Sequence, residues 1–366
     1  MKKLLRTLII DDSAYSRRTL SDILEASGEC EVVGVARDGE DGLKKALELK
    51  PDLITLDLEM PKMDGFTFLR ILMKSLPTPV LVISGMNQSK TVFRAMEMGA
   101  VDFIAKPDMK MSQDLYDIKE DLLMKVKVVS QLRINNIQKR ITEKEPGEND
   151  VIPTLGIEKR ASPQTKGAFR CLVIGSSTGG PTALQTILSS LPGNLPISIA
   201  ISQHMPAGFT KAFAERLNKY SQWEVKEAQN GDILSYGKAF VAPGGYHMLL
   251  RKNGEEVKIE IAPRCAEDKY VPSVDKLFLS ASDVFANTTL GLVLTGMGND
   301  GKEGAVAIKK AGGKVIAESE KTAIVYGMPK EVISVNAVDF SLPLEEIAKE
   351  IVELTAVKNL ENSHCS

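Results

Sequence analysis

A short run of small residues carries the strongest chemical signal in this chain. Residues 175–180 read Gly-Ser-Ser-Thr-Gly-Gly and stand between the apolar run 171–174 and Pro181. A Gly-x-Ser-x-Gly pattern on a strand-to-helix turn presents its central serine, here Ser177, as a nucleophile for acyl transfer. A purely structural glycine-rich turn has the same composition, so the assignment depends on a base and an acid elsewhere in the chain.

The base that this serine needs must come from one of three histidines. His204 directly follows the apolar run 197–202 and is expected at the same sheet edge as Ser177, which makes it the predicted base. His247 remains the alternative, either as the base, as a substrate contact or as a packing residue. His364 lies in a polar tail and is a poor candidate.

The acid that orients the base is predicted at the end of a third apolar strand. Residues 291–295 lead into the segment 296–301, which contains Asp300. Asn-Asp-Gly is also common in turns, so a purely structural Asp300 remains the alternative. Ser, His and Asp at the ends of three strands favour a catalytic triad, because triads are defined by geometry and occur in several chain orders.

A second set of polar residues follows strands in the first hundred residues. In chain order they are Asp11 and Asp12, Asp57, Ser84 and Lys106. The carboxyl ends of parallel strands meet at one edge of a sheet, where carboxylates repel one another and Mg²⁺ relieves the repulsion. The ion and Lys106 would neutralise a phosphoryl group on Asp57, and Ser84 could donate a hydrogen bond to it. Each residue taken singly also has a structural explanation as a cap, a turn former or a solvated charge.

Alternating strands and helices must position the carboxylate set. Within residues 1–110, one predicted helix carries Leu20, Ile23 and Leu24, and another carries Phe66, Leu69, Ile71 and Leu72. The predicted strands lie at 8–10, 32–35, 53–56, 80–83 and 103–105. Strands that alternate with helices in this way imply a doubly wound parallel sheet.

A second α/β region positions the triad. Its predicted strands lie at 171–175, 197–202, 239–242, 291–295 and 314–317, and its helices follow Pro181, Ala207, Val274, Gly301 and Leu344. The alternating segment 257–261 predicts an antiparallel edge strand. Between the two regions we expect a long helix near 112–140 and then a charged linker containing Pro and Gly at about 141–168.

Composition limits the class of protein. The chain has 366 residues, 43% of them hydrophobic and 26% charged, which predicts two globular domains. A net charge of −2 argues against a general nucleic-acid or membrane-surface role. No export segment or run of about 18 apolar residues is found, so a cytoplasmic protein without membrane insertion is expected. The scattered cysteines predict buried thiols in a reducing compartment and no zinc site or disulfide framework; they are Cys30, Cys171, Cys265 and Cys365.

The first region resembles the receiver domain of two-component response regulators over about residues 4–125. The motifs are Ile10-Asp11-Asp12-Ser13, Leu56-Asp57-Leu58-Glu59-Met60-Pro61, Met63-Asp64-Gly65 and Asp102-Phe103-Ile104-Ala105-Lys106-Pro107. The resemblance implies phosphoryl transfer from a histidine kinase to Asp57. It implies Mg²⁺ held by Asp11, Asp12, Asp57 and the Glu59 carbonyl. It also implies a switch formed by Ser84, Phe103 and Lys106.

The whole chain resembles the chemotaxis protein-glutamate methylesterases of the CheB family. The matching motifs are Ile174–Gly180, Ser202–Phe209, Ala242–Gly244, Pro272–Asp275, Leu294–Gly301 and Gly327–Pro329. Ser176 stands where many members carry Ala, and this makes it a rival to Ser177 as nucleophile; the central position of the turn favours Ser177. The resemblance implies an oxyanion hole with the Met297 backbone N–H as donor, and Thr178 as a supporting residue.

The expected protein is therefore α/β, with two doubly wound parallel-sheet domains, a flavodoxin-like receiver and a Rossmann-like methylesterase domain, joined by a linker. The expected limits are 1–125 for the receiver, 126–168 for a helical extension and linker, 169–357 for the catalytic domain and 358–366 for a tail.

The resemblance implies hydrolysis of glutamate γ-methyl esters on methyl-accepting chemotaxis receptors and deamidation of receptor glutamines. A chemotaxis histidine kinase is the implied phosphodonor, and the esterase is expected to need no cofactor. The family also implies that the receiver covers the esterase cleft until it is phosphorylated.

Two other classes of function stay open from the residues alone. A non-enzymatic response regulator, either a transcription factor or an adaptor, would not need the triad, and no short basic recognition helix is visible in the second half of the chain. A phosphate-binding cradle at 175–180 would need the P-loop lysine or the spacing of a dinucleotide fingerprint, and both are missing.

Overall fold

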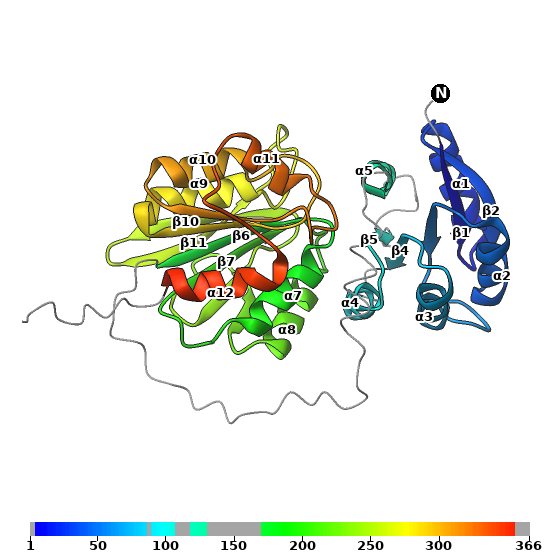
Figure 1. Cartoon of the computed structure of the whole chain (residues 1–366), viewed down its shortest axis with the longest axis horizontal. Coiled ribbons are helices and arrows are strands. Elements are labelled where there is room, and N and C mark those ends of the chain that lie inside the picture. Colours follow the sequence, from blue (N-terminus) through cyan, green and yellow to red (C-terminus); the bar gives the residue numbers. More distant parts are fainter. Residues whose placement is uncertain (1–3, 86–88, 107–117, 130–169, 356–366) are drawn as a thin grey trace, which may run out of the picture. The chain divides into compact units, whose positions relative to one another are not determined.

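The computed structural model describes residues 4–85, 89–106, 118–129 and 170–355 (Figure 1). The chain divides into two compact units, Met1–Gly147 and Glu148–Ser366, and each is described by itself. The predicted linker 141–168 and tail 358–366 lie outside the described residues, as does most of the predicted helix 112–140.

The first unit contains a five-stranded parallel sheet with strand order β2-β1-β3-β4-β5, which is the flavodoxin-like order. All five predicted strands are confirmed. In chain order its elements are β1 (Leu5–Ile10), α1 (Ala14–Ala26), β2 (Cys30–Ala36), α2 (Gly39–Leu49), β3 (Leu53–Leu56), α3 (Gly65–Ser75), β4 (Val80–Gly85), α4 (Ser89–Glu97), β5 (Asp102–Lys106) and α5 (Lys119–Val129).

Local chemistry starts the helices of this unit. Ser13, Asp38 and Asp64 each accept a hydrogen bond from a backbone N–H in the first turn of α1, α2 and α3, respectively. Such caps satisfy N–H groups that have no partner inside the helix. On α3, Leu69 is buried as its spacing suggests, whereas Ile71 is 36% exposed and does not belong to the apolar face.

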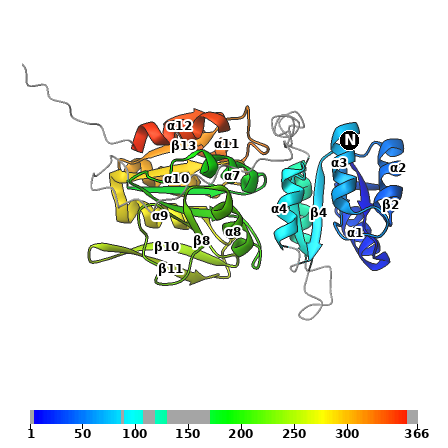
Figure 2. The same ribbon diagram turned by 90° about the horizontal axis from the view of Figure 1, so that it is seen from below.

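The second unit contains a seven-stranded parallel sheet, β14-β13-β12-β6-β7-β9-β8, and a separate antiparallel hairpin, β10-β11. Helices α7, α8 and α12 lie on one face of the sheet, and α9, α10 and α11 lie on the other (Figures 1 and 2). The elements are β6 (Cys171–Ser176), α7 (Gly180–Ser190), β7 (Ser198–Gln203), α8 (Thr210–Tyr220), β8 (Glu224–Glu227), β9 (Lys238–Val241), β10 (Tyr246–Asn253), β11 (Glu256–Pro263), α9 (Val274–Phe285), η3 (Ala286–Thr288), β12 (Thr289–Val293), α10 (Lys302–Lys310), β13 (Lys314–Glu318), α11 (Met328–Ser334), β14 (Phe340–Leu342) and α12 (Leu344–Thr355).

The order of this sheet reverses between β6 and β12. From β6 the chain adds β7, β8 and β9 on one side, and β12 to β14 extend the sheet on the other side. In open parallel sheets, ligands bind outside the carboxyl ends of the strands at such a switch point. The segments that follow β6, β7 and β12 carry Ser177, His204 and Asp300, so the topology brings the predicted triad to this edge.

The predicted edge strand at 257–261 is antiparallel, but it belongs to the hairpin and not to the main sheet. The hairpin packs against α9 because Met248 and Leu250 are buried, and the Leu250 N–H donates to the Ser280 hydroxyl at 3.0 Å. This placement connects the loop between β11 and α9 to the edge where the triad is predicted.

The cysteines only partly match expectation. Cys30 and Cys171 are buried free thiols, and burial raises the pKa of Cys171 to about 12. Cys265 is exposed, so the prediction of buried thiols is wrong there, because the residue lies in the polar loop between β11 and α9. Cys365 lies outside the described residues. Among the described helices, none has the length and apolar character needed to cross a bilayer.

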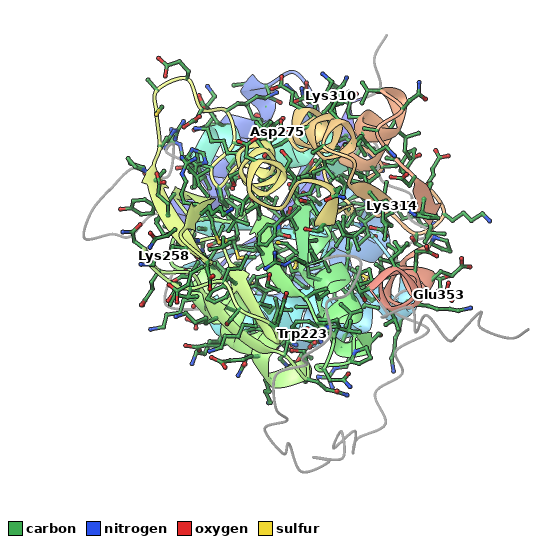
Figure 3. The ribbon with its side chains drawn as sticks, turned by 90° about the vertical axis from the view of Figure 1, so that its left-hand side faces the viewer. Trp223, Lys258, Asp275, Lys310, Lys314 and Glu353 are labelled. Carbon is green, nitrogen blue, oxygen red and sulfur yellow. The ribbon has the colours of Figure 1, made fainter. Side chains whose placement is uncertain are left out.

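The packing of α9 on β6 gives a first prediction. A Cβ atom at Gly175 would lie 2.2 Å from a methyl carbon of Val274, so Gly175→Ala must push α9 away from the sheet and should lower stability by about 1–3 kcal/mol. The measurement is urea unfolding followed by the fluorescence of Trp223, the chain's single tryptophan, which is 2% exposed in the second unit (Figure 3).

The same substitution in the first unit is the control. A Cβ atom at Gly42 would meet the flexible end of Ile10, and Gly42→Ala should leave the transition reported by Trp223 unchanged. An unchanged midpoint for Gly175→Ala would show that α9 does not pack on β6 as described.

Candidate active site

The two serines of the turn after β6 have different environments. Ser176 is the last residue of the strand, has no exposed surface, and donates its hydroxyl hydrogen to Gln203 Oε1 at 2.6 Å. Ser177 is half-buried, and its hydroxyl makes no hydrogen bond within the described residues. Of the two candidates, only Ser177 presents a hydroxyl that a substrate can reach.

Glycines allow the turn to pass close to its neighbours. Gly179 has a φ of +77°, in the left-handed region that favours glycine, and directly precedes α7. A Cβ atom at Gly180 would lie 2.1 Å from Gln203 Oε1. The Ser177 N–H donates to the Thr295 carbonyl at 3.1 Å, so the turn is also fixed to the segment that follows β12.

Gln203 joins the serine turn to the predicted base. Its side-chain Nε2 donates to the carbonyl oxygens of Ser177 and His204, each at 2.9 Å, and the His204 N–H donates to the Ser176 carbonyl at 3.0 Å. Gln203 is buried, and sequence reasoning missed its role because the contact spans adjacent strands. These bonds fix the backbone that carries the predicted nucleophile and the predicted base.

Asp300 is a buried carboxylate with many partners. It is 2% exposed and accepts hydrogen bonds from the N–H groups of Val274 (2.7 Å) and Asp275 (2.8 Å) and from the Ser273 hydroxyl (3.0 Å). These donors form the N-terminus of α9, where the helix dipole favours negative charge. The contacts lie at least 25 residues away in sequence, so Asp300 is not simply a turn former.

Asp300 also binds the imidazole of His204. Asp300 Oδ2 and His204 Nε2 are 2.8 Å apart, and the His204 side chain keeps 15% of its surface exposed. Burial raises the pKa of Asp300, but His204 and the α9 backbone N–H groups outweigh this and hold the pKa below its ordinary value. The carboxylate is therefore ionised beside a base whose other nitrogen, Nδ1, is left for proton transfer.

The serine and the imidazole are neighbours without being directly bonded. Among the described residues, no hydrogen bond joins the Ser177 hydroxyl to His204. Catalytic hydrogen bonds are often long in free enzymes and shorten when substrate binds. The backbone carbonyls of the two residues share the Gln203 side chain as donor, so their backbones are held together before substrate binds.

His247 has the environment of a structural residue. It is 1% exposed; its Nδ1 accepts from the Ser273 N–H at 3.2 Å, and its Nε2 lies 2.8 Å from Asp268 Oδ2. Both nitrogens are therefore engaged, which leaves none to take a proton from a serine. Hydrogen bonding by Lys276 is the largest of the effects that lower the pKa of Asp268, with Cys265 N–H and His247 adding to it.

The predicted oxyanion residues lie on the same edge. Thr178 is buried, and its carbonyl accepts from the Thr295 hydroxyl at 3.0 Å. Met297 is half-buried, and its backbone N–H has no hydrogen-bond acceptor within the described residues. This N–H is available to a substrate oxygen, whereas Thr178 is engaged in holding the turn.

In the first unit, the structure brings together the predicted carboxylates. One oxygen from each of Asp11, Asp12 and Asp57 lies within 4.8 Å of the others; Asp11 and Asp57 are buried, and Asp12 is exposed. Lys106 Nζ lies 3.0 Å from Asp11 and also contacts Asp57. Hard oxygen ligands at this spacing fit Mg²⁺.

The charges of this cluster depend on one another. Burial raises the pKa of Asp11, and Lys106 only partly offsets it. Burial lowers the pKa of Lys106, but Asp11 and Asp57 together raise it above its ordinary value. The remaining predicted residues lie nearby in the fold: Ser84 on β4 is fully buried, Phe103 on β5 is 2% exposed, and Glu59 donates its N–H to Asp57 at 3.2 Å.

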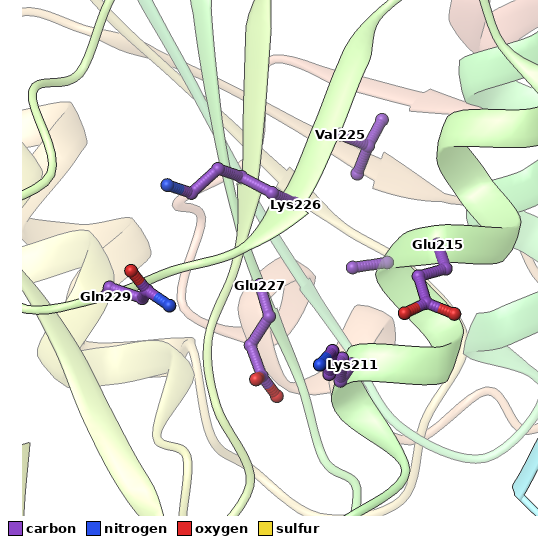
Figure 4. Close-up of a pocket in the computed structure, with 7 residues that line it drawn as sticks. Lys211, Glu215, Val225, Lys226, Glu227 and Gln229 are labelled. Carbon is purple, nitrogen blue, oxygen red and sulfur yellow. The ribbon is translucent and has the colours of Figure 1, made fainter.

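A pocket of about 270 Å³ lies elsewhere in the second unit, between α8 and β8 (Figure 4). Its lining is Lys211, Ala214, Glu215, Val225, Lys226, Glu227 and Gln229. None of the predicted catalytic residues lines it. Lys226 is paired with Asp232 at 2.8 Å, and Glu227 accepts from the Thr210 hydroxyl at 2.5 Å, so these two charged side chains have partners within the fold.

Comparison with known proteins places this geometry in a family. The CheB methylesterase family profile matches residues 172–351, and the response regulator receiver domain profile matches residues 7–115. Protein-glutamate methylesterase/protein-glutamine glutaminase 3 of Geobacter sulfurreducens is 48% identical to the chain, over 96% of this chain and 98% of that protein. The chain belongs to the CheB methylesterase family. It is an enzyme of the protein-glutamate methylesterase/protein-glutamine glutaminase class that carries a receiver domain.

Further CheB relatives agree. Protein-glutamate methylesterase/protein-glutamine glutaminase 1 of Myxococcus xanthus is 43% identical, over 96% of this chain and 98% of that protein. The crystal structure of the Thermotoga maritima CheB methylesterase catalytic domain is 40% identical with a TM-score of 0.50, covering 51% of this chain and 98% of that chain. These matches confirm the predicted family and fold class. The matched ranges fall inside the predicted domains 1–125 and 169–357, whose limits stay predictions.

The carboxyl group beside Asp300 gives a pH-dependent prediction for this CheB protein. Burial raises the pKa of Asp275 to about 6, and the charges of Asp300 and Glu303 add to this although the Gly304 N–H opposes it. Because the folded state binds this proton more tightly than the unfolded chain, ionised Asp275 costs stability above pH 6, and the cost disappears as the pH falls towards 4.

Asp275→Asn should therefore raise the melting temperature by about 2–4 °C at pH 7.5, equivalent to roughly 1 kcal/mol, and the gain should shrink towards pH 4. The melting temperature is measured by the fluorescence of Trp223, which lies in the same unit as Asp275 on α9 (Figure 3). Asp283→Asn, at an exposed position of the same helix, is the matched control and should change little. A gain that is equal at all pH values would contradict the explanation.

Proposed function

We propose that this protein is a phosphorylation-regulated hydrolase that removes methyl groups from glutamate γ-methyl esters of chemoreceptors and deamidates specific receptor glutamines. The proposed mechanism passes through an acyl-enzyme formed by Ser177, with His204 as the base and Asp300 as the acid. The observation that carries the proposal is the 2.8 Å contact between His204 and a buried, ionised Asp300, beside the accessible Ser177.

The chemistry has two steps. Ser177 Oγ attacks the ester carbonyl while His204 Nδ1 takes its proton; the tetrahedral intermediate then expels methoxide, which receives that proton and leaves as methanol. Water, deprotonated by His204, attacks the acyl-enzyme and releases the glutamate carboxylate and Ser177. A glutamine substrate follows the same path with ammonia as the leaving group. General-base catalysis contributes typically about 10²–10⁴-fold.

Asp300 supports both steps without itself accepting the proton. Its position at the N-terminus of α9 keeps it ionised, so it stabilises the imidazolium that forms on His204 and fixes which ring nitrogen faces the serine. This support is preorganised, because the three donors that hold Asp300 are present before substrate binds.

The negative oxygen of the tetrahedral intermediate needs a separate donor. We assign this role to the Met297 N–H, with Thr178 holding the turn and the N-terminal end of α7 adding its dipole. One such donor is worth about 10²–10³-fold in rate. The proposed esterase needs no metal or cofactor.

The proposed regulation uses the carboxylate cluster of the receiver. Asp57 would take a phosphoryl group from a chemotaxis histidine kinase; Asp11, Asp12, Asp57 and the Glu59 carbonyl would hold Mg²⁺, which supplies positive charge to the transferring group. Lys106, already between Asp11 and Asp57, would contact the phosphoryl oxygens, and Ser84 and Phe103 would change position in response. We propose that phosphorylation exposes the esterase site. The proposed protein is cytoplasmic, does not bind nucleic acid and does not insert into a membrane.

The identity of the nucleophile is tested with two adjacent serines. Ser177→Ala should lower methanol release from methylated receptor membranes by about 10³-fold or more, since it removes the attacking oxygen. Ser176→Ala is the matched control and should keep activity within about tenfold, because that hydroxyl is buried and bonded to Gln203. Loss with Ser176→Ala and retention with Ser177→Ala would reverse the assignment.

Regulation is tested with a small-molecule phosphodonor and Mg²⁺. Methanol release by the wild-type protein should rise by about 5–150-fold, the usual range of allosteric coupling. Asp57→Asn should abolish the rise while keeping the basal rate, and Asp22→Asn, an exposed carboxylate of α1, should respond as wild type does. An equal response in Asp57→Asn would refute the phosphorylation site.

A further inference from the structure

Tyr270 lies against the predicted base and is part of none of the roles assigned above. Its ring stacks on the His204 imidazole with the ring centres 4.9 Å apart and the planes only 5° from parallel. The residue sits in the loop between β11 and α9 and is partly exposed. It therefore covers one face of the ring that must exchange protons with Ser177.

The same side chain touches the segment that leads to the acid. A Cβ atom at Gly298 would lie 2.3 Å from the Tyr270 hydroxyl, so only glycine lets the tyrosine approach there. The hydroxyl donates a long hydrogen bond, 3.5 Å, to Asn299 Oδ1. Tyr270 thus fills the space between His204 and the backbone that joins Met297 to Asp300.

The loop that carries Tyr270 is fixed on both sides. On one side, Asp268 accepts from the Cys265 N–H and lies 2.8 Å from His247 Nε2. On the other, the Ser273 N–H donates to His247 Nδ1 at 3.2 Å. Buried His247 thereby ties together the two ends of the short segment that contains Tyr270, which accounts for a histidine that the proposed chemistry does not use.

His204 needs such a neighbour. Within the part of the chain that the structure describes, the His204 ring has one hydrogen bond, to Asp300; it fixes the position of Nε2 but permits the ring to tilt about that contact. A tilt displaces Nδ1, and a misplacement of about 1 Å can cost 10²-fold in rate. A parallel ring at van der Waals contact opposes the tilt, and its face favours the charged imidazolium.

We propose that Tyr270 is a positioning residue for His204, acting through the flat face of its ring; this rests on the proposed triad mechanism. The ring, and not the hydroxyl, is the active feature, because the hydrogen bond from the hydroxyl to Asn299 is long and exposed to solvent. The residue acts on the transition state through the base and not on substrate binding.

Steady-state methanol release by the full chain tests the proposal. Tyr270→Leu should lower kcat by about 10–100-fold and leave KM within about twofold, whereas Tyr270→Phe should keep most of kcat. Tyr246→Leu, at a 50% exposed tyrosine that begins β10, is the matched control and should change neither constant. An unchanged kcat in Tyr270→Leu, an effect on KM alone, or equal losses in the Leu and Phe variants would overturn the proposal.

A spectroscopic measurement tests the stacking independently of catalysis. The chain has three histidines, so the ring C–H signals of His204 can be assigned in histidine-labelled protein by comparison with His204→Gln. Loss of the Tyr270 ring current should shift these signals in Tyr270→Leu but not in Tyr270→Phe, while Trp223 fluorescence confirms that each variant is folded. Unshifted signals in Tyr270→Leu would refute the contact.

Ser177→Ala, measured in parallel, distinguishes a failure of the triad mechanism from a failure of the positioning role of Tyr270. If it retains activity, the triad mechanism fails whatever Tyr270 does. If it is inactive and Tyr270→Leu is fully active, the triad stands and the positioning role is wrong.

Discussion

The sheet edge that carries the proposed triad of the second unit depends on one buried negative charge. Asp300 is almost completely removed from water, which is costly for a carboxylate unless charged or hydrogen-bonding partners replace the solvent. The N-terminus of α9 and the imidazole of His204 are those partners. Satisfying this charge therefore fixes three elements at once: the segment after β12, the first turn of α9 and the residue that follows β7.

The receiver also buries carboxylates, but a lysine side chain and not a helix N-terminus compensates their charge. Asp11 and Asp57 are also buried at the carboxyl edge of a parallel sheet, but the compensating charge is Lys106, whose long side chain is 21% exposed. Backbone donors hold Asp300 in a permanent arrangement, whereas a flexible ammonium group can yield to a metal ion or a phosphoryl group. The first arrangement suits a group that must stay in place through a catalytic cycle, and the second suits a site that changes state.

Sequence reasoning located the strand ends because apolar runs and glycine-rich turns are local signals. The triad and the receiver cluster both follow such runs, and the structure brings each set to one edge. Short elements gave no comparable signal, so β8, with the sequence Glu-Val-Lys-Glu, was not predicted, and neither were β14 and α11. The longer strand β10 was also not predicted.

The partners of the predicted residues could not be predicted, because their contacts join distant parts of the chain. Ser273 reaches Asp300 across 27 residues. It stands directly before the apolar start of α9, which is a recognisable helix cap, yet nothing in that pattern tells which carboxylate the helix will face. The contacts of Gln203 and Tyr270 are still harder to predict, since an amide and a tyrosine have no characteristic spacing to a distant histidine.

The contacts of Gln203 show why the residue before the proposed nucleophile matters. The carbonyl oxygens of Ser177 and His204 can only accept, so they require the Gln203 Nε2 on their side. The Gln203 Oε1 then points towards Ser176, whose hydroxyl donates to it. With alanine at position 176 the buried Oε1 would lose this donor, and an unsatisfied buried acceptor costs about 1–3 kcal/mol. The Gln203 amide would still be held by its two donor bonds. In the proposed mechanism Ser176 therefore contributes rigidity to the site and Ser177 makes the attack, a physical distinction between two adjacent serines that their positions in the turn only suggest.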